Sequence, residues 1–163
     1  MNIKTFTLIH VAISLVGIAS GLVVMYGLLT RRRLNGWTAL FLITTVATSV
    51  TGFGFPITHF GAPHIVGIIS LALLAAAIFA RYTCKLAGPW RWVYVITAAL
   101  ALYLNVFVGI AQAFQKIPTL NSLAPTQTEL PFAIAQLVVL ALFVVLTVVA
   151  VRTFRVIPVR TLE

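Results

Sequence analysis

The three histidines are the side chains of this sequence best suited to hold a metal ion or a haem. His10 lies near the N-terminus, whereas His59 and His64 lie in a segment rich in glycine and proline. Two imidazoles that face each other at one depth of a helical bundle can ligate a b-type haem, and His10 with His64 is the pair that fits this requirement. All three imidazoles together could instead ligate zinc or copper, although the spacing of His59 and His64 follows no recognised metal signature.

Carboxylates are almost absent, which weighs against several kinds of chemistry. The chain contains Glu129 and Glu163 but no aspartate, so it has neither a Ser-His-Asp triad nor paired carboxylates within one apolar segment. The single cysteine, Cys84, is predicted to lie on the opposite side of the membrane from the histidines. These patterns favour a protein that is not an enzyme. They also weigh against proton-coupled transport, which commonly uses acidic or histidine relays inside the membrane.

Neutral polar side chains are the remaining candidates for a binding site. His10, Ser14, Gly17 and Gly21 recur at helical spacing, so they share one helix face, and the two glycines allow close approach of a neighbouring helix. Threonines form a similar stripe within residues 44–51. The candidate ligand-binding residues are predicted to share the outer third of the membrane, except for one deeper amide: they are His10, Thr51, His64, Gln112 and Gln136, with Asn105 deeper.

These six residues have two interpretations. Ligand sites combine apolar walls with a few hydrogen-bonding groups, so the six could form a polar pocket for an amphipathic ligand. Threonines in apolar helices also bond to their own backbone, and buried amides or histidines often do no more than join neighbouring helices. The sequence leaves both interpretations open.

The elements that must position these residues are membrane-spanning helices. The 163 residues are 61% hydrophobic and 8% charged, whereas soluble domains carry about 25% charged residues. A bilayer core about 30 Å thick takes roughly 20 apolar residues per helix. The uncharged runs therefore predict an all-α integral membrane helical bundle, a single transmembrane domain over residues 1–163, with five transmembrane helices at about 6–30, 36–55, 64–86, 90–115 and 131–152.

Glycine and proline mark the breaks between these helices. Gly88 and Pro89 separate the third helix from the fourth. The segment 116–130 contains two prolines, so it is predicted to be an outer loop that is too rich in proline for a helix. Pro131 is well placed in the first turn of the fifth helix.

The basic residues predict the orientation of the bundle. Nine of the eleven lysines and arginines fall on one side of the five-helix topology and two on the other. Because basic residues concentrate in cytoplasmic loops, the N-terminus is predicted outside and the C-terminus in the cytoplasm. The same clustering accounts for the net charge of +9 without nucleic acid as a partner. The histidines and the candidate amides then fall towards the outside.

Two segments carry a resemblance to known proteins. GFGFPITHFGAPHIVGI and AFQKIPTLNSLAPTQTELPF resemble parts of small uncharacterised multi-pass inner-membrane proteins of proteobacteria. The resemblance implies a multi-pass protein of the bacterial inner (cytoplasmic) membrane. It implies no activity, and no functional residue is carried over from it.

The sequence favours a non-catalytic integral membrane protein. Such a protein is either a small helical subunit, associating with other membrane subunits or with copies of itself, or a binder of a lipid- or quinone-like ligand in an outer-leaflet polar pocket. A haem b redox protein that uses His10 and His64 is one alternative. A facilitator or channel for a neutral solute, lined by Asn105, Gln112 and the threonine stripe, is another. The lipid bilayer is the partner common to all three hypotheses.

Overall fold

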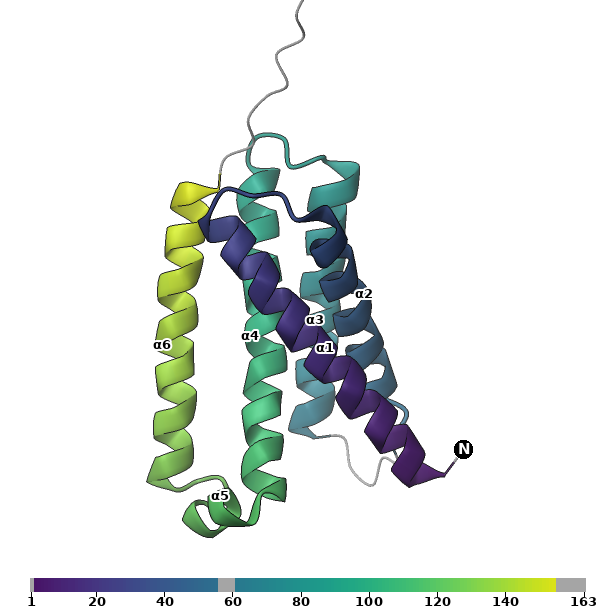
Figure 1. Ribbon diagram of the computed structural model, residues 1–163, viewed down its shortest axis with the longest axis vertical. Helices are drawn as coiled ribbons and strands as arrows, with labels where there is room; N and C mark the ends of the chain where they lie inside the picture. Colours follow the sequence, from purple (N-terminus) through teal and green to yellow (C-terminus); the bar gives the residue numbers. More distant parts are fainter. Residues whose placement is uncertain (1, 56–60, 155–163) are drawn as a thin grey trace, which may run out of the picture.

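The computed structural model describes residues 2–55 and 61–154, and these residues form helices joined by short turns (Figure 1). In chain order the helices are α1 (Ile3–Leu29), α2 (Asn35–Gly52), α3 (Ala62–Ile78), α4 (Trp90–Lys116), α5 (Pro118–Leu123) and α6 (Leu130–Thr153), with a π-helical turn η1 (Phe79–Thr83) after α3. The described part of the chain contains no strand. The prediction of an all-helical fold is confirmed.

Four helical segments are long and apolar enough to cross a membrane. They are Ile3–Leu29, Pro63–Thr83, Trp90–Lys116 and Leu130–Thr153. The remaining long helix, α2, is less apolar because it contains Asn35 and several threonines. Its 18 residues nevertheless extend over about 27 Å, close to the thickness of a bilayer core. The structure therefore supports a membrane protein with four helices of spanning character, and the crossing by α2 stays a prediction.

The five long helices lie side by side and alternate in direction along the chain (Figure 1). One end of the bundle, which we call the basic end, contains the linkers 30–34 and 84–89 and the end of α6. The start of α1 and the short helix α5 lie at the other, which we call the α5 end. The basic end carries seven of the described cations: Arg31, Arg32, Arg33, Arg81, Lys85, Arg91 and Arg152. Lys4 and Lys116 lie at the α5 end, and Arg155 and Arg160 lie outside the described residues.

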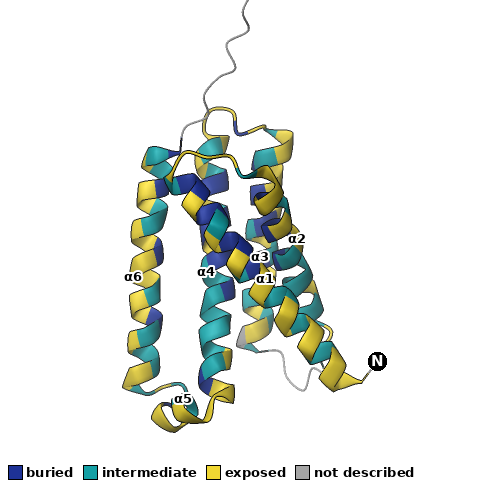
Figure 2. Ribbon diagram, viewed as in Figure 1, coloured by how far each residue is buried: buried dark blue, intermediate teal, exposed yellow. Residues whose placement is uncertain are grey.

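The core lies between α1, α2, α3 and α4. Phe41, Leu74, Tyr94 and Leu102 are almost completely buried there, and Figure 2 shows the buried positions gathered along the second half of α1 and along α4. The outward faces carry large exposed apolar side chains, most of all on α6. Because a soluble protein rarely exposes so wide an apolar surface, this distribution is the one expected of helices that face lipid.

The third helix is shorter than the predicted range 64–86. After Ile78 the chain makes the π turn, in which the Cys84 N–H donates to the Phe79 carbonyl at 3.0 Å. Lys85 and Leu86 then take positive φ angles and end the helix. Gly88 follows at φ +52°, a conformation that glycine adopts without strain, and α4 begins after Pro89.

The segment 116–130 contains a helix, so the prediction that proline keeps it non-helical is wrong for residues 118–123. Pro118 lies in the first turn of α5, where a helix makes no use of the missing N–H. Two side-chain amides then fasten the segment to the end of α4. Asn121 donates to the Phe114 carbonyl at 3.2 Å, and Gln127 donates to the Ala111 carbonyl at 2.6 Å.

Glu129 orders the turn before α6. Its carboxylate accepts hydrogen bonds from the Thr126 hydroxyl at 2.9 Å and from the N–H groups of Thr126 and Thr128, both at 3.1 Å. Desolvation raises the pKa of this carboxyl, but the hydrogen bonds outweigh it and hold the pKa below its usual value. The turn is therefore most stable above the ordinary carboxyl pKa, and it loses that support as the pH falls through the lowered pKa.

Candidate functional site

His10 and Thr51 join α1 to α2 near the α5 end. The His10 Nδ1 atom lies 2.8 Å from the Thr51 hydroxyl oxygen. The Thr51 hydroxyl donates its single hydrogen to the Ala47 carbonyl, at 2.7 Å. With the Thr51 hydroxyl donating in this direction, His10 donates through Nδ1 and a neutral imidazole keeps its lone pair on Nε2; in the other tautomer Nδ1 accepts from the Thr51 hydroxyl. The Phe55 ring packs edge-on against the imidazole, with the ring centres 5.1 Å apart.

His64 occupies a different environment at the start of α3. The Gly61 N–H donates to His64 Nδ1 at 3.3 Å, an arrangement that caps the helix. The imidazole lies against Phe53, with ring centres 5.9 Å apart. Because Nδ1 accepts this hydrogen bond, a neutral His64 carries its hydrogen on Nε2. A haem iron would need a lone pair on that atom, so this arrangement of His64 is not the one that ligates haem.

The described histidines therefore contact different partners, and each contact has a structural use. Among the described residues, no three His, Cys, Asp or Glu side chains lie close enough to hold a metal ion. His59, the third member of the metal hypothesis, lies outside the described residues.

Five polar residues of α1 and α2, together with one glycine, form a row that we call the polar track: His10, Ser14, Gly17, Thr44, Thr48 and Thr51. One turn deeper than the His10 pair, the Ser14 hydroxyl donates to Thr48 at 3.4 Å. One turn deeper again, Gly17 faces Thr44 and the Asn105 amide of α4. The predicted helical face of α1 therefore does point into the bundle.

Gln136 and Gln112 lie apart from the polar track. Gln136 is buried between α6 and α4, where its Nε2 donates to the Phe107 carbonyl at 3.2 Å. Its Oε1 has no partner among the described residues. Gln112 is exposed on α4. The six candidate residues thus lie in several environments: His10 and Thr51 bond to each other, and Asn105 of α4 faces Gly17 deeper in the bundle.

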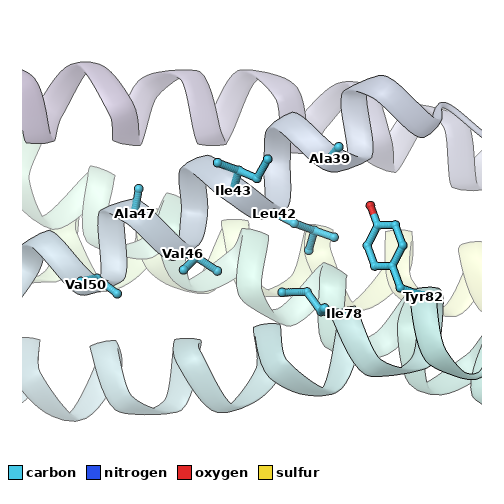
Figure 3. Close-up of a pocket in the computed structure, with 8 residues that line it drawn as sticks. All are labelled: Ala39, Leu42, Ile43, Val46, Ala47, Val50, Ile78 and Tyr82. Atoms are coloured by element: carbon cyan, nitrogen blue, oxygen red, sulfur yellow. The ribbon is translucent and has the colours of Figure 1, made fainter.

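The structure also contains an apolar hollow that the sequence patterns do not predict. A groove of about 660 Å³ runs between α2 and α3 and opens to the outside of the bundle (Figure 3). We call it the lipid groove, and its lining residues are aliphatic except for one tyrosine: Ala39, Leu42, Ile43, Val46, Ala47, Val50, Ile78 and Tyr82. The small residues Ala39 and Ala47, two turns apart around Ile43, are the only signal of it in the sequence. A smaller apolar hollow of about 170 Å³ lies between α4 and α6.

Charged and aromatic side chains surround the Tyr82 end of the lipid groove. Arg81 donates to the Asn35 side chain at 2.7 Å, and its guanidinium lies 5.8 Å from the ring centre of Tyr82 and 5.1 Å from that of Tyr94. Trp37 is half-exposed in the first turn of α2. Tryptophan and arginine at this level of a membrane protein favour the headgroup layer. The Tyr82 end of the groove therefore lies at the level of these charged and aromatic side chains, and the groove extends along α2 as far as Val50.

Replacing Thr51 with valine is expected to destabilise the fold by about 0.6–2 kcal/mol, because His10 loses its partner inside the bundle. Thr97→Val is the matched control, since Thr97 makes the same bond to its own helix, at 2.7 Å to the Val93 carbonyl, without the second bond to a histidine. The control is expected to change the free energy of unfolding by less than about 0.5 kcal/mol. Denaturant titration in detergent micelles measures both, and equal losses would contradict a structural role for the His10 contact.

Comparisons of the chain with protein-family models, with curated proteins and with solved structures returned no match.

Proposed function

We propose that this chain is a non-catalytic integral membrane protein of five transmembrane helices that binds an amphipathic lipid in the groove between α2 and α3. The observation that carries the proposal is the lipid groove, whose volume of about 660 Å³ falls within the range of about 300–1,000 Å³ found for ligand pockets. Its aliphatic walls suit a hydrocarbon chain. The polar pocket expected near the outer side is the weaker site, because His10, Thr51, Ser14 and Thr48 already bond to one another.

The charge beside the Tyr82 end of the groove favours an anionic phospholipid as the occupant. Tyr82 lies at the basic end, where Arg81 is half-buried and Arg31, Arg32 and Arg33 are exposed. Basic side chains close to a membrane surface each attract anionic lipid by about 1 kcal/mol. An acyl chain along α2 would bring the phosphate of the same lipid to the level of these cations.

The proposed orientation places the basic end in the cytoplasm and the α5 end outside. It is supported by the cations that gather at one end of the bundle, since basic residues concentrate in cytoplasmic loops. The resemblance to proteobacterial inner-membrane proteins supports the bacterial cytoplasmic membrane as the location. Anionic lipid in the leaflet next to the basic end would then be the lipid that the groove meets.

Native mass spectrometry of protein released from membranes tests the bound lipid. We expect an anionic phospholipid to remain on the wild-type chain and to be retained roughly tenfold less by Ala47→Trp, since the indole fills the groove and a tenfold loss corresponds to about 1.4 kcal/mol. Leu137→Trp is the control, because Leu137 is exposed on α6 outside both hollows.

Three outcomes of this experiment would contradict the proposal. A wild-type chain free of any bound molecule would remove the ligand. Equal retention by Ala47→Trp and Leu137→Trp would place the ligand elsewhere. A neutral quinone in place of the phospholipid would contradict the anionic head group while leaving the groove as the binding surface.

A further inference from the structure

Two polar atoms in the middle of the bundle have no partner among the described residues: the Thr45 hydroxyl oxygen and the Asn105 Nδ2. Thr45 is 1% exposed and Asn105 is 9% exposed, so neither side chain reaches bulk solvent or lipid headgroups. Buried polar atoms are nearly always hydrogen-bonded, and those that lack a protein partner commonly bond to an internal water. The pair therefore requires a physical explanation.

Both atoms point to the same small region beside Gly17. A Cβ atom on Gly17 would lie 3.0 Å from Asn105 Nδ2 and 3.3 Å from the hydroxyl oxygens of both Thr44 and Thr45. Thr44 donates its own hydrogen to the Leu40 carbonyl at 2.7 Å, so its oxygen is available as an acceptor. The Asn105 amide of α4 can therefore donate a hydrogen bond at this point, the Thr44 oxygen of α2 can accept one, and the Thr45 hydroxyl can donate or accept. All three groups lie beside Gly17, which has no side chain to fill the space between them.

The convergence point is the inner end of the polar track. The pairs Ser14 with Thr48 and His10 with Thr51 connect it, turn by turn, to the α5 end. In the opposite direction Gly21 packs against Phe41 and Leu102, which are each 1% exposed. Polar groups therefore extend from the α5 end to the middle of the bundle and stop there.

We propose that one water molecule binds between Gly17, Thr45 and Asn105 and reaches this site along the polar track from the α5 end. The water oxygen accepts from Asn105 Nδ2 and from the Thr45 hydroxyl, and the water donates one hydrogen to the Thr44 oxygen. The site does not suit a cation, because no carboxylate lies on α1, α2 or α4 to balance a positive charge. The inference is independent of the lipid groove, which lies on the other side of α2.

Magnetic resonance of the chain in lipid nanodiscs, labelled with ¹⁵N in its asparagine side chains, tests the water site. The four asparagines are Asn2, Asn35, Asn105 and Asn121, and the three at the helix ends can be substituted one at a time to assign the fourth. We expect magnetisation to pass from water to the Asn105 amide hydrogens, although the side chain is buried. Absence of this transfer in the wild-type chain would overturn the proposal.

Gly17→Ala distinguishes two routes by which magnetisation could reach the Asn105 amide: from a bound water, or from water through a threonine hydroxyl. The added methyl occupies the convergence point and leaves both hydroxyls in place, so the transfer from water to Asn105 is expected to fall to the noise. Gly109→Ala is the control, since its Cβ would lie 3.4 Å from Ile18 Cδ1, at ordinary contact distance, and the transfer is expected to persist. Transfer that is unchanged by Gly17→Ala would overturn the site.

A second measurement keeps the test decisive if Gly17→Ala does not fold. An experimental density map of the wild-type chain, at a resolution that shows ordered water, is expected to contain a peak at about 2.7–3.2 Å from both Asn105 Nδ2 and the Thr45 oxygen. A direct hydrogen bond between these two side chains, with no peak between them, would overturn the proposal.

Discussion

Gly21→Ala is expected to destabilise the bundle by about 1–3 kcal/mol, a large effect for a single added methyl group. The new Cβ would overlap Leu102 Cδ1 and would lie 2.9 Å from two atoms of the Phe41 ring. Real side chains essentially never approach this closely, and both neighbours are 1% exposed, so they have little room to move. The methyl would therefore push α1 away from α2 and α4.

Gly109→Ala isolates this effect from the general preference of helices for alanine. Both glycines lie within helices, so both substitutions gain a similar amount of helix propensity, about 1 kcal/mol. At Gly109 the methyl meets only Ile18 Cδ1, at 3.4 Å. Denaturant unfolding in mixed micelles should show Gly109→Ala as neutral or stabilising and Gly21→Ala as destabilising. Equal free energies of unfolding would mean that α1 does not pack on Phe41 and Leu102 in solution.

The inward face of α1 could be predicted because its polar and small residues are periodic. His10, Ser14, Gly17 and Gly21 recur at helical spacing, and the structure places each of them against another helix. In a chain as apolar as this one, polar and small residues are the main indication that a helix face packs against other helices. Leucine and valine occur both in the core and on the lipid-facing surface, so they carry no comparable information.

Neither the lipid groove nor the exposure of Gln112 could be predicted from the local sequence pattern. A groove is a lack of side-chain volume between two helices, and it depends on their crossing, which no local pattern of alanine and valine specifies. Gln112 is an amide on an apolar helix, a pattern that predicts a position facing the bundle, yet it is exposed. It lies close to the end of α4, where a long polar side chain can reach the headgroup layer instead of a neighbouring helix.

The sequence pattern predicts neither the short helix α5 nor the π turn, because both depend on how a helix ends. The prolines of the segment 116–130 predict a loop, whereas Pro118 lies in the first turn of α5, where it is tolerated. The pattern over residues 64–86 predicts one continuous α-helix. The structure instead inserts the π turn where Phe79 packs on Trp90, with ring centres 5.3 Å apart. Such tertiary contacts override the local preference.

Whether α2 crosses the membrane decides the topology, and the alternatives predict opposite labelling. If α2 crosses, the linker after α1 and the π turn after α3 lie on one side of the membrane, and α5 lies on the other. If α2 stays on one side, α3, α4 and α6 are inverted relative to α1, so that the linker after α1 shares a side with α5. The alternating arrangement of all five long helices supports the first alternative (Figure 1).

Single cysteines at Arg33, Thr83 and Ser122 are expected to separate these alternatives, because all three positions are exposed. In a Cys84→Ser parent, which removes the only native thiol, a membrane-impermeant maleimide should label Ser122→Cys on intact cells. Arg33→Cys and Thr83→Cys should be labelled only after permeabilisation, since the proposed orientation places the basic end in the cytoplasm. Labelling of Arg33→Cys and Ser122→Cys from the same side would show that α2 does not cross. Labelling of only Arg33→Cys and Thr83→Cys on intact cells would keep the five crossings and reverse the proposed orientation.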